Sequence, residues 1–188
     1  VAMMLPSASP MILLFASVNR RRRERAVPSV RTAIFAAGYL GLWILFSALA
    51  ALVQWSLHRV ALLSPDMASA SPVFGGILLL SAGIYQWLPV KNVCLTRCRS
   101  PLSFIQTEWR EGPAGAVVMG LRHGLFCLGC CWVLMSLLFV AGVMNLIWVA
   151  AIAGFILLEK LAPGGQWVGK ATGMLLAAWG AWLLLGAA

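Results

Sequence analysis

The chain has 188 residues, of which 62% are hydrophobic and only 10% are charged, whereas soluble domains average about 25% charged residues. Nine Trp and 18 Gly add to this bias, since glycine and aromatic residues are enriched in and beside membrane spans. The composition excludes a soluble globular domain. The net charge of +9 suggests no nucleic-acid partner, because no basic face with stacking aromatics lies outside the apolar segments. We predict an integral membrane protein that contacts the lipid bilayer.

Apolar segments divide the chain, and about 20 residues of helix are needed to cross a bilayer core of about 30 Å. We predict six spans, at about residues 1–18, 32–55, 73–90, 122–141, 144–158 and 171–185. The stretch SPLSFIQTEWREG alternates polar and apolar residues at helical spacing, which predicts a short cytoplasmic interfacial helix before the fourth span. The expected fold class is all-α: a polytopic membrane helical bundle of about six transmembrane helices, forming one integral membrane domain over residues 1–188.

The basic residues predict an orientation. Six Lys and Arg lie in the link 19–31, five in 91–122 and two in 160–170, whereas Arg59 is alone on the other side if the spans alternate. Because cytoplasmic loops are enriched in Lys and Arg, we expect the three basic links in the cytoplasm and the C-terminus outside. The predicted location is the bacterial inner (cytoplasmic) membrane, crossed several times.

Three of the five cysteines fall within one apolar stretch, GLFCLGCCWVLM, just after His123. Residues four apart stack on one face of a helix, which places His123, Cys127 and Cys131 in one stripe. Cys130 is seven residues from His123 and lies on the same side. The stripe is expected in the first turns of the fourth span, at its cytoplasmic end.

The other two cysteines, Cys94 and Cys98, follow the third span directly and are predicted on the same side of the membrane. Glu159 ends the fifth span there as well. Thiolate and imidazole ligands select copper(I) or zinc over magnesium and calcium, and the cytoplasm disfavours structural disulfides. The pattern therefore predicts a soft-metal site, with copper(I) as the first candidate and zinc as the second.

Other interpretations of these residues remain open. A buried cysteine is a common small hydrophobe, and Glu159 next to Lys160 could form a plain ion pair at a helix end. The C-x-x-C spacing of Cys127 and Cys130 also serves thiol–disulfide exchange, although the predicted side of the membrane disfavours it.

Methionines form a second pattern. Met3 and Met4 precede Met11 by eight and seven residues, so one helix face could present two or three thioethers. We expect Met3 near the outer surface and Met11 near mid-membrane. Such a ladder suits copper(I), while packing of irregular gaps is the alternative. Met144 lies near the outer turn after the fourth span.

Four stretches, AMMLPSASPM, KNVCLTRCRSPLSF, GLRHGLFCLGCCWVLM and GVMNLIWVAAIAGFILLEKLAPGG, together resemble a bacterial family of predicted metal-binding integral membrane proteins, often labelled copper chaperones. Members of that family usually begin with further hydrophobic sequence before the MMLP motif. The resemblance implies a metal-binding set composed of Met3, Met4, Cys94, Cys98, His123, Cys127, Cys130, Cys131, Met144 and Glu159.

We therefore expect a soft-metal binding protein that handles copper or delivers it to a receiving protein. No acid/base pair, nucleophile–base spacing or phosphate loop is present in the sequence, so we expect no enzyme. The alternative is a structural or assembly subunit of a larger membrane complex, whose close helix packing would use Gly38, Gly41, Gly75, Gly76 and Gly83. A further alternative is a quinone or pigment bound in a cleft lined by Trp43, Trp55, Trp87, Trp132 and Trp148.

Overall fold

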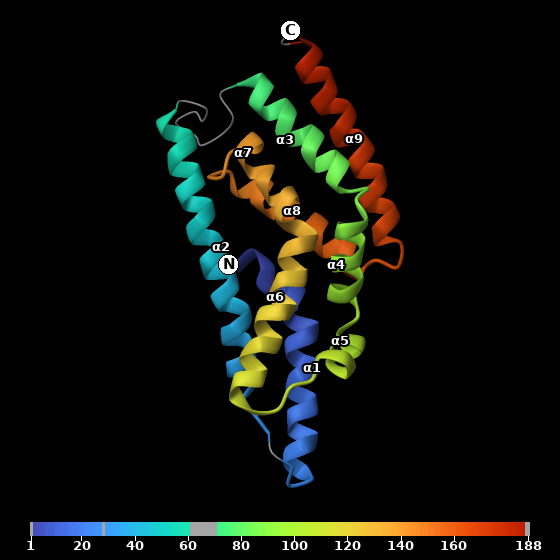
Figure 1. The fold of residues 1–188 in the computed structure, drawn as a ribbon. Helices are drawn as coiled ribbons and strands as arrows, with labels where there is room; N and C mark the ends of the chain where they lie inside the picture. The colour runs from blue at the N-terminus through green and yellow to red at the C-terminus, as the bar shows by residue number, and fades with distance from the viewer. Residues whose placement is uncertain (1, 28, 61–70, 187–188) are drawn as a thin grey trace. The chain divides into compact units, whose positions relative to one another are not determined.

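The computed structural model describes residues 2–27, 29–60 and 71–186, and helices dominate it (Figure 1). The elements in chain order are η1 (Ala2–Met4), α1 (Leu5–Glu24), α2 (Thr32–Arg59), α3 (Pro72–Tyr85), α4 (Pro89–Arg99), α5 (Pro101–Glu108), α6 (Gly112–Ser136), α7 (Leu138–Ala141), α8 (Leu146–Leu161) and α9 (Gly165–Gly186). The predicted all-α class is confirmed. Most of the link predicted between the second and third spans, residues 61–70, lies outside the described residues.

Three described stretches are long and apolar enough to cross a membrane: α2, α6 continued by α7, and α9. The pair of α3 and α4, bent by 65°, would add a fourth if it crosses as one broken span. The first and fifth predicted spans also form helices, but α1 carries its arginines within its 20 residues and α8 has only 16. The predicted total of six spans is therefore only approximate.

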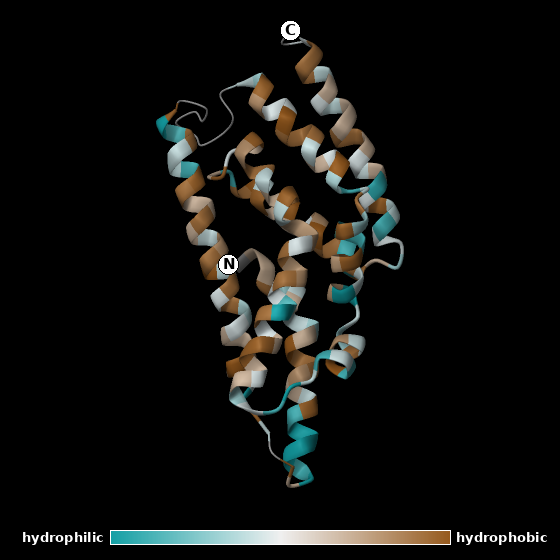
Figure 2. Cartoon of the chain, in the orientation of Figure 1, coloured by the Kyte–Doolittle hydropathy of each residue, from teal (hydrophilic) through white to brown (hydrophobic). Residues whose placement is uncertain are grey.

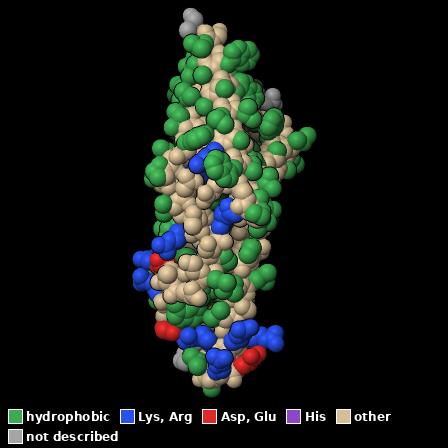
Figure 3. Space-filling model, turned by 90° about the vertical axis from the view of Figure 1, so that its right-hand side faces the viewer, with side chains coloured by type: hydrophobic (Ala, Val, Ile, Leu, Met, Phe, Trp, Pro, Cys, Tyr) green, Lys and Arg blue, Asp and Glu red, His purple; other side chains and the backbone are tan. Residues whose placement is uncertain are grey.

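The outer surfaces of these helices are apolar. In the apolar windows of α2 and α9, only 17% of the residues are buried inside the chain. Hydrophobic residues follow α2, α8 and α9 along their length (Figure 2), and hydrophobic side chains cover much of the face seen in Figure 3. Exposed apolar surface of this extent indicates a membrane environment.

The chain divides into two compact units. The first contains Val1–Ser47 and Val93–Cys130, and the second contains Ala48–Asn92 and Cys131–Ala188. Each unit is discontinuous in sequence. The single domain over residues 1–188 remains a prediction.

In the first unit, glycines let α2 and α6 approach each other with their backbones nearly in contact. A Cβ atom added to Gly38 would collide with the backbone of Val117, and one added to Gly120 would collide with the carbonyl of Phe35. Gly124 in turn meets Leu42, about one turn further along both helices, and the two helices run in the same direction in Figure 1. Close to them lies an apolar core of Met11, Phe15, Phe35, Phe104, Ala116 and Met119.

In the second unit, α3 and α9 run antiparallel with the same kind of contact. A Cβ atom on Gly83 would lie 2.6 Å from the Gly173 carbonyl oxygen, and one on Gly180 would lie 2.7 Å from the Gly76 carbonyl oxygen. Within membranes, such small residues allow the van der Waals packing that holds helices together. Gly76 and Gly83 therefore serve contacts within this chain.

A buried ion pair lies in the second unit, where α3 breaks into α4. Lys91 Nζ donates to Glu159 Oε1 of α8 at 2.6 Å, and both side chains are only 2% exposed. Lys91 Nζ also donates to the side-chain oxygen of the buried Gln86. Gly169 of α9 makes room for the carboxylate, because a Cβ atom there would collide with Glu159 Oε1. The charges are thus paired and shielded within the unit.

The short helix predicted before the fourth span is present as α5, but the fourth predicted span begins earlier than expected. The prediction started that span at Arg122, whereas α6 begins at Gly112. Gly112, with φ of +77°, adopts a backbone conformation that favours glycine, and Pro113 follows at the helix start, where its missing N–H costs nothing. The Gly-Pro pair therefore marks the beginning of a helix. Residues 112–121, which were predicted to belong to the link before the fourth span, form the first ten residues of α6.

We expect Gly83→Ala to destabilise the protein by about 1–3 kcal/mol, because the added methyl group overpacks a contact with backbone atoms. Gly154→Ala is the matched control, since a Cβ atom on this α8 glycine meets nothing within 4 Å. That substitution should be neutral or stabilise the helix by up to about 1 kcal/mol. Thermal unfolding in mild detergent measures both, and equal effects would contradict the close approach of α3 and α9.

Glu159→Leu leaves the Lys91 ammonium buried without its counter-ion, so we expect a loss of about 3–5 kcal/mol. Adding Lys91→Met removes both charges and should restore most of the thermal stability in detergent. Glu24→Gln, which breaks the exposed Arg20–Glu24 pair, is the control and should change stability by less than about 0.5 kcal/mol. A double variant no more stable than Glu159→Leu would show that Lys91 and Glu159 do not compensate each other.

Candidate metal site

The centre of the site is a buried stripe on α6 within the first unit. His123, Cys127 and Cys130 are spaced four and three residues apart, and all three side chains are almost completely buried. The α2 helix covers this stripe closely because Gly120 and Gly124 carry no side chains. A Cβ atom on Gly124 would lie 2.8 Å from the Leu42 side chain.

Tyr39 of α2 connects the stripe to the start of the chain. Its hydroxyl donates to the Met4 carbonyl oxygen at 3.2 Å and lies 3.4 Å from Cys127 Sγ. The phenol has one proton, so the Cys127 thiol is the donor in the second contact. Ser7 also donates to the Met4 carbonyl oxygen at 3.0 Å, and its oxygen is 4.0 Å from Cys127 Sγ. The buried Met4 is thereby held beside Cys127.

Aromatic rings surround His123. The centroid of its imidazole lies 6.3 Å from that of Phe35, 5.9 Å from that of Tyr39 and 5.4 Å from that of Phe104. These rings come from α2 and α5. They exclude water and limit the orientations of the imidazole.

Cys94 of α4 packs against the same helix. Its sulfur occupies the space beside Gly129, where a Cβ atom would lie only 2.7 Å away, and the thiol is within electrostatic range of Cys130. Cys98 lies one helical turn further along α4 and is also buried. Since Phe104 of α5 contacts His123 and Phe126, the α4–α5 segment follows α6 past the whole stripe. Sulfur atoms from separate parts of the chain therefore lie together.

The stripe lies further along its helix than the sequence suggested. Thirteen residues of α1 separate Ser7, beside Cys127, from Arg20, which corresponds to about 20 Å of helix. Fifteen residues of α6 separate Gly112 from Cys127, or about 22 Å. The stripe was expected in the first turns of its helix, near the arginines. It lies in the middle of α6 because this helix begins ten residues early, although Arg122 still directly precedes His123.

The thiols are close but do not converge on one point. In the described part of the chain, no three His, Cys, Asp or Glu side chains are arranged to hold a metal ion. The Cys130 thiol donates to the Cys127 carbonyl oxygen at 3.0 Å, while the Cys127 thiol is engaged by Tyr39. All five cysteines are described and none forms a disulfide. Metal binding would deprotonate the thiols and release these hydrogen bonds, so that the side chains could turn toward a shared ion.

Other residues of the predicted set lie elsewhere. Met3 is partly buried next to Met4, whereas Met144 belongs to the second unit and is 75% exposed. Cys131 is buried one turn beyond Cys127 but belongs to the second unit. Glu159, also in that unit, forms the ion pair with Lys91.

Tyr39 and Ser7, which lie beside the Cys127 sulfur, were not predicted from the sequence. A signal for the first was present, since a tyrosine within a span needs a partner for its hydroxyl. Which partner it finds depends on the neighbouring helices and could not be deduced from its own segment.

Comparison with known proteins identifies a family. The PpoB2 family model, described as copper chaperone, matches residues 1–183. No curated protein and no solved structure matches the chain. The description names copper handling rather than a catalysed reaction, in agreement with the soft donors along α6. Because the match covers nearly the whole sequence, the chain belongs to this copper chaperone family.

Proposed function

We propose that the protein is an integral membrane copper(I) carrier that binds the ion between α4 and α6 and passes it to a receiving protein. The proposed ligands are Cys127, Cys130 and Cys94, with His123 and the Met4 thioether completing the set. The observation that carries this proposal is the packing of the Cys94 sulfur against Gly129, next to Cys130. Hydrophobic packing alone does not require two thiol-bearing segments to meet at this point.

The arrangement favours copper(I) over zinc. Structural zinc sites need four converging ligands in a tetrahedron, whereas copper(I) accepts as few as two soft ligands. The described His, Cys, Asp and Glu residues offer no ready-made set of three, while the Cys94 and Cys130 thiols lie within electrostatic range of each other, as in a site of low coordination number. A thioether and thiols in a dry setting are the donors that select this ion.

A weakly organised site suits a carrier. Hydrogen bonds to Tyr39 and to the Cys127 carbonyl hold the metal-free thiols. These bonds re-form when the ion leaves, which lowers the cost of releasing it. A carrier must both bind the copper ion and release it. The exchange of thiol hydrogen bonds for metal–thiolate bonds is therefore consistent with transfer rather than storage.

Helix directions support a membrane-embedded carrier. The parallel α2 and α6 and the antiparallel α3 and α9 have the relative directions that alternating spans would give them. The two largest basic links also meet, since Arg22 donates to Glu111 at 2.9 Å. We propose the bacterial inner membrane, with these links in the cytoplasm and the C-terminus outside.

Two other functions have weaker support. An assembly subunit would use its glycines against partner chains, yet Gly38, Gly76 and Gly83 already pack within this chain. A lipophilic ligand would fit an apolar pocket of about 520 Å³ in the second unit, lined by Trp148 and Trp179. Of the other tryptophans expected in such a cleft, Trp43 is buried in the first unit, and Trp55, Trp87 and Trp132 are exposed.

Replacing both Cys127 and Cys130 by Ser should abolish stoichiometric copper(I) binding. We expect the affinity to fall by more than about 100-fold, since loss of even an outer-shell partner commonly costs about 10–100-fold. Elemental analysis after purification in mild detergent, with competition against a chromogenic copper(I) chelator, measures the effect. Met119→Leu, at a buried α6 position in the apolar core, is the control and should retain copper.

Retention of one copper ion by the Cys127→Ser/Cys130→Ser protein would contradict the proposed site. Purification only with partner chains, and without metal, would favour the assembly subunit. The same measurement on Cys98→Ser, Cys131→Ser, Met3→Leu, Met144→Leu and the Lys91→Met/Glu159→Leu double variant tests the remaining predicted ligands.

Tyr39→Phe should tighten copper(I) binding by about 2- to 10-fold, the equivalent of one hydrogen bond, because the metal-free protein then lacks the Tyr39–Cys127 bond that copper binding must break. Tyr85→Phe is a matched control, since the Tyr85 hydroxyl accepts from Trp132 in the second unit at 3.2 Å. Chelator competition distinguishes the two, and an unchanged affinity for Tyr39→Phe would remove Tyr39 from the site.

A further inference from the structure

A second candidate site lies in the first unit, at the opposite end of α1 from Cys127. A cavity of about 270 Å³ opens between the end of α1 and the start of α2. Its lining includes the guanidinium-bearing residues Arg20, Arg23 and Arg31, together with Ser29 and Thr32. Basic side chains gather at this end in Figure 3.

The wall of the cavity is fixed by Asn19, which is buried. Its amide nitrogen donates to the Phe15 carbonyl oxygen at 3.1 Å, and its side-chain oxygen accepts from the Val30 backbone N–H at 3.2 Å. These two bonds join α1 to the segment that leads into α2. The arginines around the cavity are therefore carried by a defined backbone.

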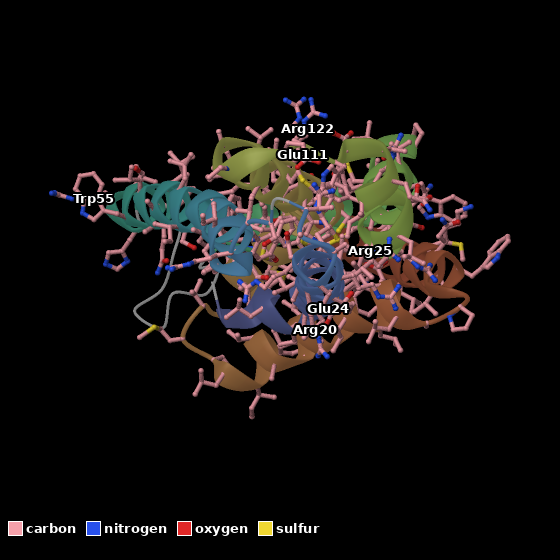
Figure 4. All side chains as sticks on the ribbon, turned by 90° about the horizontal axis from the view of Figure 1, so that it is seen from below. Arg20, Glu24, Arg25, Trp55, Glu111 and Arg122 are labelled. Atoms are coloured by element: carbon pink, nitrogen blue, oxygen red, sulfur yellow. The ribbon has the colours of Figure 1, made fainter. Side chains whose placement is uncertain are left out.

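Positive charge at the cavity is only partly neutralised. Arg20 pairs with Glu24, and the two lie next to one another on α1 in Figure 4. Among the residues that the structure describes, no acidic side chain forms an ion pair with Arg23 or Arg31. The first amides of α2 add partial positive charge, because a helix cannot satisfy its own first N–H groups.

Apolar surface continues from the cavity along α1. Leu13, Ala16, Arg20 and Arg23 follow each other at intervals of three or four residues and so share one face of the helix. Leu13 is 68% exposed. A ligand with a charged head in the cavity could lay an alkyl chain along this face.

We propose that this cavity binds a phosphate group, supplied by the headgroup of an anionic phospholipid or by free phosphate. Guanidinium groups bind phosphate oxygens with paired, charge-assisted hydrogen bonds, and Ser29 and Thr32 add hydroxyl donors. The volume is slightly below the range of about 300–1,000 Å³ of drug-sized sites, which fits a headgroup. Basic clusters beside membrane spans recognise anionic lipids in this way. The site is separate from the copper ligands and does not depend on them.

The test compares two double variants of the full chain that remove the same charge. Arg23→Gln/Arg31→Gln changes the cavity, whereas Arg21→Gln/Arg25→Gln changes exposed arginines outside its lining. Arg25 points away from Arg20 and Glu24 in Figure 4. Native mass spectrometry counts the lipid retained from detergent containing phosphatidylglycerol or phosphatidylcholine. A second arm measures the thermal shift with inorganic phosphate against chloride at equal ionic strength.

We expect one phosphatidylglycerol to be retained in preference to phosphatidylcholine, with binding at least about tenfold weaker in Arg23→Gln/Arg31→Gln. The Arg21→Gln/Arg25→Gln protein should stay within about twofold of the unaltered chain. A thermal shift with phosphate that is lost in the cavity variant, without lipid retention, would assign the site to free phosphate. Equal losses in both variants, or no binding in either arm, would overturn the proposal. Retained copper shows that the cavity variant is folded.

Discussion

The close approach of α2 to α6 is the contact on which the candidate site depends. Inside a bilayer, the hydrophobic effect does not drive helices together, so packing of small residues must do so. Gly38 and Gly120 bring the two backbones together, and Tyr39 then reaches Cys127 and Met4 at once. Larger side chains at these glycines would separate the helices and move the tyrosine hydroxyl away from both partners.

That geometry gives the thiols an environment unlike water. Aromatic rings enclose His123, and the sulfur atoms of Cys127 and Cys130 are buried with it. Hydrogen bonds satisfy the metal-free thiols of Cys127 and Cys130. A soft cation that shares its charge with thiolates is accommodated more easily there than a hard, strongly hydrated one. In the proposed carrier, this setting combines selectivity for copper(I) with a stable metal-free form.

In the second unit, a glycine makes room for a buried ion pair. Lys91 and Glu159 bury opposite charges at the break between α3 and α4, and Gly169 gives the carboxylate its space. Ionisable groups in a membrane segment are costly and usually paired. Glycines thus allow close helix packing around the candidate metal ligands in the first unit and around the Lys91–Glu159 ion pair in the second.

The sequence by itself determined the helical class, the apolar segments, α5 and the spacing of His123, Cys127 and Cys130, because these follow from periodicity within single segments. It also predicted Cys94 as a donor of the proposed site, through motif resemblance and the alternation of spans. The start of α6 was misjudged, since Gly-Pro is equally compatible with a turn and with a helix start. Only the tertiary structure decided the partners of Tyr39, the position of Met4 beside Cys127 and the Lys91–Glu159 pair. Each of them depends on the register between helices that are distant in sequence.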